Sequence, residues 1–255
     1  MHGKKEGETM SAFMPHFAPI VALLFLGTVF VLGISLLVLL YGAVRRSAFF
    51  AKLGVGAAIT IAAGYFLLLA GVSLASSEQT LPPDGWKYFC EIDCHLAYSL
   101  VSAQTAAALG PEPQQTTAHG KFVTLRVKTW FDERTISPRR GNGPLTPNRR
   151  KALLVDDTGR SYEPSPAGQF ALASSGDRST AMSQALRPGD SYTTDLAFDV
   201  PKRARGLRLL LIEDDPETRF VIGHENSPFH KKIYFDVETL ARKNQNGAEE
   251  PGSKP

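Results

Sequence analysis

The sequence predicts a two-helix transmembrane hairpin followed by an all-β antiparallel sandwich. Two observations predict the hairpin: no side chain is formally charged between Glu8 and Arg45, and none between Lys52 and Glu78. A third observation predicts the sandwich. After about residue 78 the apolar residues recur with a period of two, which is the repeat of a half-buried strand. A chain of 255 residues has room for both parts.

The two uncharged stretches contain apolar runs long enough to cross a membrane. A spanning helix needs about 18–20 apolar residues, and a soluble core helix rarely stays apolar on every face over that length. A signal peptide would carry a shorter apolar run, of about 7–15 residues, before its cleavage site. We therefore expect both helices to remain, over about residues 17–41 and 53–75, within a membrane region 17–77 that follows a short tail, 1–16.

The basic residues of the short loops predict the orientation of this hairpin. The turn between the helices carries Arg45, Arg46 and Lys52, whereas no basic residue follows the second helix until Lys87. Lysine and arginine favour the cytoplasmic side of short loops. We expect a chain integral to the inner or plasma membrane, with a cytoplasmic turn and with both termini and the C-terminal domain outside the cytoplasm.

The distribution of charge excludes a nucleic-acid-binding domain. The net charge of +3 comes entirely from residues 1–77, which have five Lys/Arg against two Asp/Glu. The remaining residues have 23 of each sign, and a nucleic-acid footprint requires an excess of basic residues.

The expected sandwich follows a linker at residues 78–86, and its strands are short and separated by turn residues. "SYTTDLAFDV" (191–200) and "KFVTLRVKTWF" (121–131) alternate apolar and polar residues, and Asp157-Thr158-Gly159 predicts a hairpin within 152–162. Several short strands without a long amphipathic helix are typical of a sandwich, which we place at residues 87–240, before a disordered tail at 241–255. The other expected strands are 207–212, 219–222 and 232–237.

Part of this domain resembles small bacterial immunoglobulin-like domains that follow a lipoprotein signal or a membrane helix. The stretch "ALRPGDSYTTDLAFDVPKRARGLRLLL" carries the resemblance, supported by "VTLRVKTWF" and "LLVDDTGRSYEPS". In that family a Pro-Gly-Asp/Glu turn leads into a strand that ends Phe-Asp-Val-Pro. The resemblance covers roughly residues 95–215 and implies an immunoglobulin-like sandwich, in a family of mostly unassigned function, without catalytic residues.

The stretch "FCEIDCHLAY" (89–98) contains both cysteines and permits several interpretations. We favour a turn at 91–93 that closes a clip, either a disulfide between Cys90 and Cys94 or a soft-metal site of Cys90, Cys94 and His95, with His224 or His230 as a fourth ligand. An uninterrupted strand with the even-numbered residues buried is the nearest alternative. Attachment of c-type haem is disfavoured, because C-x-x-x-C-H is one residue longer than the usual motif.

A basic segment with prolines and glycines, "DERTISPRRGNGPLTPNRRK", is expected to form a loop. It would be solvated or would contact anionic lipid headgroups or an acidic partner. Its cations include Arg139, Arg140, Arg149, Arg150 and Lys151.

Two functions remain open at this stage. The absence of nucleophile-elbow, zincin, P-loop and dinucleotide motifs favours a non-catalytic, membrane-anchored interaction or assembly module that binds a protein partner and needs no cofactor. The alternative is a metal- or redox-handling accessory protein, for copper delivery or electron transfer, that would bind copper or zinc through the C-x-x-x-C-H motif at 90–95.

Overall fold

The computed structural model describes residues 9–11, 18–91, 94–113, 115–176 and 179–248, and the chain forms two compact units. The hairpin unit contains Phe13–Glu78 and Pro216–Lys231. The sandwich unit contains Met1–Ala12, Gln79–Asp215 and Lys232–Pro255. The segment Pro216–Lys231, which we call the insertion, therefore leaves the sandwich and belongs with the helices.

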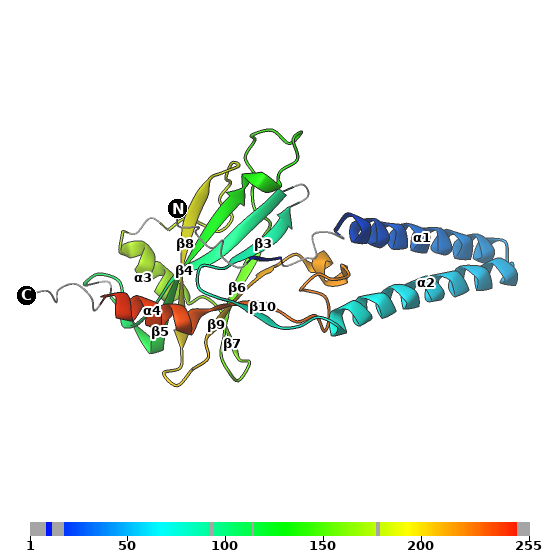
Figure 1. The fold of residues 1–255 in the computed structure, drawn as a ribbon. Helices are drawn as coiled ribbons and strands as arrows, with labels where there is room; N and C mark the ends of the chain where they lie inside the picture. The colour runs from blue at the N-terminus through cyan, green and yellow to red at the C-terminus, as the bar shows by residue number, and fades with distance from the viewer. Residues whose placement is uncertain (1–8, 12–17, 92–93, 114, 177–178, 249–255) are drawn as a thin grey trace, which may run out of the picture. The chain divides into compact units, whose positions relative to one another are not determined.

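The hairpin unit is built on two antiparallel helices, α1 (Ala18–Val44) and α2 (Ala48–Leu74) (Figure 1). Both are long and apolar enough to cross a membrane, and their large side chains are exposed around the helices, as at Leu23 and Leu67. Compared with the expected spans, α1 ends three residues later and α2 begins five residues earlier, because the basic turn is tighter than the sequence suggested. Arg46 occupies the left-handed region at φ 52° and reverses the chain there.

Small residues let the two helices approach closely. A Cβ atom on Gly54 would lie 2.7 Å from the backbone nitrogen of Leu39 and 2.7 Å from the carbonyl oxygen of Ser35. Gly42 meets the backbone of α2 in the same way. Backbone contact through small residues is the usual means by which apolar helices associate in lipid.

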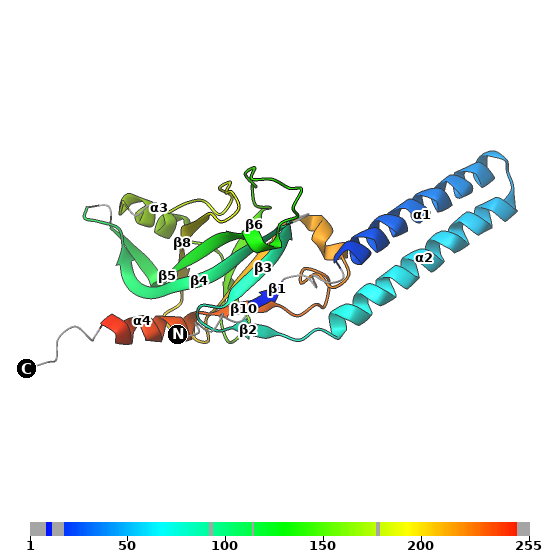
Figure 2. The same cartoon turned by 45° about the horizontal axis from the view of Figure 1, so that its top comes forward.

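The sandwich unit consists of two five-stranded sheets (Figure 2). The strands of each sheet are named below in their spatial order, so that consecutive strands in a list are hydrogen-bonded to each other. The first sheet contains β1 (Thr9–Ser11), β3 (Trp86–Glu91), β4 (Cys94–Leu109), β5 (Thr116–Asp132) and β8 (Ser191–Val200). The second contains β2 (Gln79–Leu81), β10 (Ile233–Asp236), β9 (Arg208–Glu213), β6 (Arg150–Val155) and β7 (Ser161–Tyr162).

Most strand pairs are antiparallel, as the sequence predicted, but two pairs are parallel. Strand β1, in the expected N-terminal tail, pairs with β3, and strand β2, in the expected linker, pairs with β10. These two strands flank the helical hairpin in sequence, and both belong to the sandwich unit.

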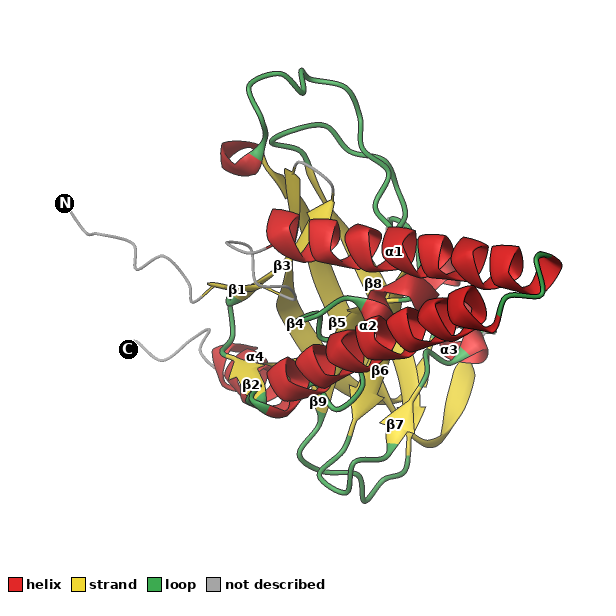
Figure 3. Ribbon diagram, turned by 90° about the vertical axis from the view of Figure 1, so that its right-hand side faces the viewer, coloured by secondary structure: helices red, strands yellow, loops and turns green. Residues whose placement is uncertain are grey.

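Two short helices pack on the sheets (Figure 3). Helix α3 (Pro166–Ser174) begins at Ser165, whose hydroxyl accepts a hydrogen bond from Gly168, and packs on β8 and β5. Helix α4 (Val237–Ala248) begins after Asp236, whose carboxylate accepts a hydrogen bond from Thr239, and packs on β4 and β9. The expected disordered tail is thus helical as far as Ala248. The remaining regular segments are the 3-10 turns Glu133–Thr135 and Pro216–Phe220, and the latter replaces part of the strand expected at 219–222.

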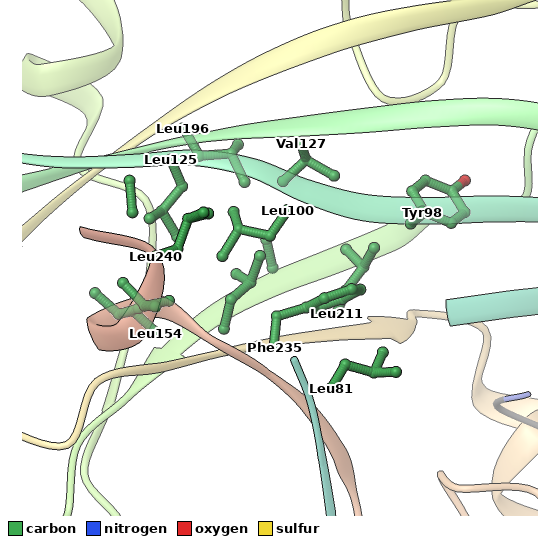
Figure 4. Packing of buried hydrophobic residues seen from close by; sticks show 14 of the residues in the cluster. Leu81, Tyr98, Leu100, Leu125, Val127, Leu154, Leu196, Leu211, Phe235 and Leu240 are labelled. Carbon is green, nitrogen blue, oxygen red and sulfur yellow. The ribbon is translucent and has the colours of Figure 1, made fainter. Parts of the chain in front are cut away.

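The core lies between the sheets and is mostly aliphatic. Leu100, Leu125 and Val127 of the first sheet face Leu211 and Phe235 of the second (Figure 4). Each fully buried side chain of this size stabilises the fold by roughly 1.5–3 kcal/mol. The core also receives Leu81 from the short strand β2 and Leu240 from α4, so the flanking segments are part of the domain.

Candidate functional site: a buried charged layer beneath an aromatic face

The chain reverses direction within the cysteine stretch. Strand β3 ends at Glu91 and β4 begins at Cys94, and the two are antiparallel, with Cys90 opposite His95 and Glu91 opposite Cys94. One unbroken strand, the nearest alternative to a clip, is therefore not what forms. Residues 92–93 and the side chains of residues 90–95 lie outside the described part of the structure, so the disulfide and the metal clip stay predictions.

The two histidines considered as a fourth ligand lie in the insertion. His224 is buried, and its Nδ1 accepts a hydrogen bond from the backbone N–H of Asn226 at 3.0 Å. His230 Nδ1 lies 2.7 Å from the carbonyl oxygen of Lys231, so that nitrogen carries the proton and donates. Among the residues that the structure describes, no three His, Cys, Asp or Glu side chains gather as metal ligands do.

The five cations assigned to the basic loop separate into different environments. Arg139 and Arg140 lie in the loop, and the Arg140 guanidinium is 5.1 Å from the ring centre of Phe131. Arg149 pairs with Asp215 at 3.5 Å, and Lys151 pairs with Glu163 at 2.8 Å. Arg150 is not a loop residue: it begins β6, and its side chain is fully buried.

A layer of charged and polar side chains crosses the core at this point. Arg150 Nη1 lies 3.2 Å from Glu213 Oε1, and these residues are register partners in the second sheet. Facing them is Lys87 of β3, which is 0% exposed and donates from Nζ to the carbonyl oxygens of Leu211, at 2.6 Å, and Ile233, at 3.1 Å. A buried cation is tolerated only where hydrogen bonds and opposite charge replace its water.

Aromatic rings complete the layer. The Arg150 guanidinium is 4.3 Å from the ring centre of Phe89 and 5.6 Å from that of Tyr98, and the two rings meet edge to face at 5.3 Å. Lys87 Nζ is thus hydrogen-bonded inside the fold, and the Arg150 guanidinium lies between the Glu213 carboxylate and two aromatic rings. This arrangement favours a structural role, because a buried charged network restricts which strand register the sheets can adopt.

The burial of Lys87 could not be recognised from the sequence, for an identifiable reason. In β4 the even-numbered residues Leu96 and Tyr98 are buried, as expected, but in β3 the odd-numbered Lys87 and Phe89 are buried. The register pairs Lys87 with Tyr98 and Phe89 with Leu96, so the turn between the strands switches the parity of the core face.

The opposite side of the same strands carries an aromatic and cationic surface. Trp86 and Trp130 come from β3 and β5, and their ring centres are 5.5 Å apart. Between these strands, β4 places the small residue Ala97 opposite Tyr88 and Trp130, and Ser99 opposite Lys128, and both are almost completely buried. Lys128 Nζ lies 6.0 Å from the ring centre of Trp86. We call Trp86, Tyr88, Lys128, Trp130 and Arg134 the tryptophan face.

Asp132 fixes the position of Arg134 on this face. The guanidinium donates two hydrogen bonds of 3.0 Å to the carboxylate, from Nε and Nη2, and its Cζ lies 5.4 Å from the Trp130 ring centre. Burial alone would raise the pKa of Asp132, but the hydrogen bonds from Arg134 and Tyr88 outweigh it and hold that pKa below its ordinary value. Burial and the hydrogen bond to Asp132 raise the pKa of Tyr88 to about 12. The Arg134 side chain is 62% exposed, so a charged group is held over an aromatic ring at the surface.

An open cleft of about 910 Å³ lies where β5 begins and β8 ends. Its carboxylates are engaged locally: Asp199 lies 2.9 Å from His119 Nδ1, and Glu163 bonds to Lys151. Three cations line it, and the arrangement could hold an anionic group. These cations are Arg160, Lys202 and Arg203.

Comparisons with known proteins leave the family open. No family model matches the chain, and no curated protein matches it. The solved structures similar to it include the secreted protein MPT63 from Mycobacterium tuberculosis (11% identity, 64% of this chain and 99% of that chain, TM-score 0.39) and a conserved hypothetical protein from Bacillus anthracis (11%, 49% and 85%, TM-score 0.37). An uncharacterised β-sandwich protein from Clostridium difficile is similar at 6% identity, over 64% of this chain and 95% of that chain, with a TM-score of 0.34. At these scores the likeness says nothing of function.

Proposed function

We propose that this chain is a membrane-anchored interaction module, non-catalytic, whose immunoglobulin-like sandwich is held outside the cytoplasm and binds an acidic segment of a partner protein. Support for the anchor comes from the helices, whose large apolar side chains are exposed around their circumference, with Phe30 68% and Leu67 73% exposed. A helix that is apolar on every face needs an apolar solvent. The strands that precede and follow the hairpin, β1 and β2, both belong to the sandwich unit, which suits a hairpin that starts and ends on one side of a membrane.

The observation that carries the binding proposal is the tryptophan face. Tryptophan, tyrosine and arginine are the residues most enriched at the energetic centres of protein interfaces. Here the aromatic residues occupy one side of β3 and β5, and Arg134, in the 3-10 turn after β5, is already oriented by Asp132. A side chain oriented in advance loses little conformational freedom on binding. The charge of Lys128 and Arg134 favours an acidic partner segment.

Site-specific photo-crosslinking tests this proposal in native membranes. A photoreactive amino acid replaces Lys128 on the tryptophan face or, as a matched control, Lys202 in the cleft. We expect a discrete protein adduct from position 128 only. Trp130→Ala should abolish the adduct, whereas Phe170→Ala, a change at an exposed residue of α3, should leave it unchanged. Crosslinking from position 202 alone, or an adduct insensitive to Trp130→Ala, would contradict the proposal.

A second function, the handling of a soft metal or of redox equivalents, is favoured by the reversal of the chain between Glu91 and Cys94. This reversal brings the cysteine-bearing strands side by side. Thiol titration, metal analysis and visible absorbance of the aerobically purified chain test it. Bound copper or zinc that is lost on Cys94→Ser would support the alternative. Two freely reactive thiols without metal would exclude both the metal clip and the disulfide.

A further inference from the structure

The insertion Pro216–Lys231 is a folded element of the hairpin unit. Its chain is held by local hydrogen bonds, from Asn226 Nδ2 to Thr218 Oγ1 at 2.9 Å and from Ser227 Oγ to the carbonyl oxygen of Val221 at 2.5 Å. His224 and Glu225 are buried. The segment therefore has a defined surface, and the side chains on that surface have defined directions.

The insertion covers one end of the helical hairpin. Ile222 packs against Tyr65 and Leu69 of α2, in a cluster that also includes Val21 and Phe25 of α1. The Tyr65 hydroxyl donates to the carbonyl oxygen of Phe220 at 2.5 Å, and Ser76 Oγ accepts from the backbone N–H of Lys231 at 2.8 Å. These contacts lie at the end of the hairpin opposite the basic turn.

The distance between these contacts and the basic turn matches the thickness of a bilayer core. From Phe25 to Val44 α1 rises about 29 Å, and from Ala48 to Tyr65 α2 rises about 26 Å, at 1.5 Å per residue. The hydrocarbon core of a bilayer is about 30 Å thick. If Arg45 and Arg46 lie at one boundary, the insertion lies at the other.

The exposed surface of the insertion includes residue types that are typical of a membrane–water boundary. Phe220 and Phe229 are 48% and 71% exposed, and the exposed cations Arg219 and Lys231 are near them in sequence. Aromatic rings and basic side chains are the residues that anchor proteins at this depth. Phe229 has φ 66°, a backbone conformation that a bulky residue adopts rarely.

From these observations we infer that the insertion is a membrane-interface anchor, whose Phe229 and Phe220 side chains enter the boundary between lipid headgroups and acyl chains. It would fix the depth of the hairpin in the bilayer. This inference rests on the proposed membrane anchoring but concerns a separate element, since the helices could span a bilayer with the insertion facing water.

Quenching of tryptophan fluorescence by brominated lipids tests the inference. The full chain is reconstituted in phosphatidylcholine vesicles that carry bromine near the headgroup end or near the middle of the acyl chain. Phe229→Trp and, as a second position, Phe220→Trp are compared with Phe170→Trp, an exposed phenylalanine of the sandwich unit. The parent chain gives the background of its own two tryptophans, which is subtracted from the emission of each variant.

We expect the shallow bromines to reduce the added emission of Phe229→Trp at least twofold, the deep bromines to reduce it less, and neither to affect that of Phe170→Trp. If the vesicle-bound chain resists alkaline extraction but the tryptophans introduced at positions 229 and 220 are quenched no more than the one at position 170, the interface anchor is excluded while the membrane anchoring stands. If the chain is released by alkaline extraction, the membrane anchoring itself fails and the interface anchor fails with it.

Discussion

The two units of this chain distribute their side chains in opposite ways. In the hairpin unit, large apolar residues such as Leu23 and Phe30 face outward, and the helix backbones approach each other at Gly42 and Gly54. In the sandwich unit the apolar residues are inside, and even Lys87 and Arg150 are buried. The difference is the one expected if the sandwich is surrounded by water and the hairpin, as proposed, by lipid. Water drives apolar side chains into the sandwich, whereas helices in lipid gain nothing from burying leucine and associate through small residues.

The largest expected loss of stability comes from a change in the charged layer of the sandwich. Glu213→Gln removes the charge that pairs with buried Arg150, and breaking a buried ion pair costs roughly 3–5 kcal/mol. Urea unfolding of the full chain in detergent, followed by the fluorescence of Trp86 and Trp130, measures this loss, because both tryptophans belong to the sandwich unit.

Two further variants sharpen this test. Asp215→Asn removes the partner of the exposed Arg149 and should cost no more than about 1 kcal/mol. The double change Arg150→Met with Glu213→Leu replaces the pair by apolar side chains and should be less destabilising than Glu213→Gln alone. If Glu213→Gln and Asp215→Asn lowered the free energy of unfolding equally, the layer would not be a buried charge network.

A smaller effect is expected in the hairpin unit. Gly54→Ala would place a methyl group 2.7 Å from two backbone atoms of α1, and overpacking of this kind costs roughly 1–3 kcal/mol. The change should lower the temperature at which the helical circular dichroism signal is lost in detergent.

Gly56→Ala is the matched control, because no atom outside the neighbouring backbone of its own helix lies within 4 Å of the added methyl group. It should leave the transition temperature unchanged or raise it slightly, since alanine favours the helix by about 1 kcal/mol over glycine. The same response from both variants would mean that the helices do not pack through Gly54.

The smallest effect concerns a surface turn of the sandwich and depends on pH. Asp156 accepts hydrogen bonds from Thr158, from the backbone of Arg160 and from Tyr162, and those from Thr158 and Tyr162 contribute most to lowering its pKa to about 2. A carboxyl group whose pKa is lower in the folded state stabilises the fold above its ordinary pKa, near 3.8, and loses that contribution as the pH falls toward 2.

Asp156→Asn should therefore lower the urea midpoint of unfolding at pH 6. The difference in urea midpoint between the variant and the parent should decrease between pH 5 and pH 2. The neighbouring Asp157 is exposed, so Asp157→Asn provides a control that should follow the parent throughout. A difference in urea midpoint that stayed constant down to pH 2 would show that the charge of Asp156 does not stabilise the turn.

The sequence predicts well where local pattern decides the structure. The strand expected at 191–200 is β8 to the residue, because Pro188-Gly189-Asp190 forms a turn before it and its alternation is unbroken. Both long helices and the hairpin of β6 and β7 were also predicted. The prediction of a strand at 219–222 was wrong, because a four-residue run of this kind does not distinguish a strand from a turn that packs on a helix.

The sequence predicts the structure poorly where contacts between residues far apart in the chain determine it. The tryptophan face joins Trp86 to Trp130 across β4, and this depends on a register that no local pattern reveals. The same is true of the parallel pairing of β1 with β3 and of β2 with β10, and of the burial of Lys87. Helices α3 and α4 had a readable signal: Ser165 before Pro166, and Asp236 three residues before Thr239, are helix N-caps.

The central claim, that the hairpin crosses a membrane with its basic turn in the cytoplasm and the sandwich outside, is tested most directly by cysteine accessibility. In a Cys90→Ser/Cys94→Ser background, single cysteines replace Ala48, at the basic turn, and Gln245, in α4. A membrane-impermeant maleimide applied to intact spheroplasts should label position 245 at once and position 48 only after the membrane is permeabilised. Labelling of both positions from outside, or of position 48 alone, would contradict the account.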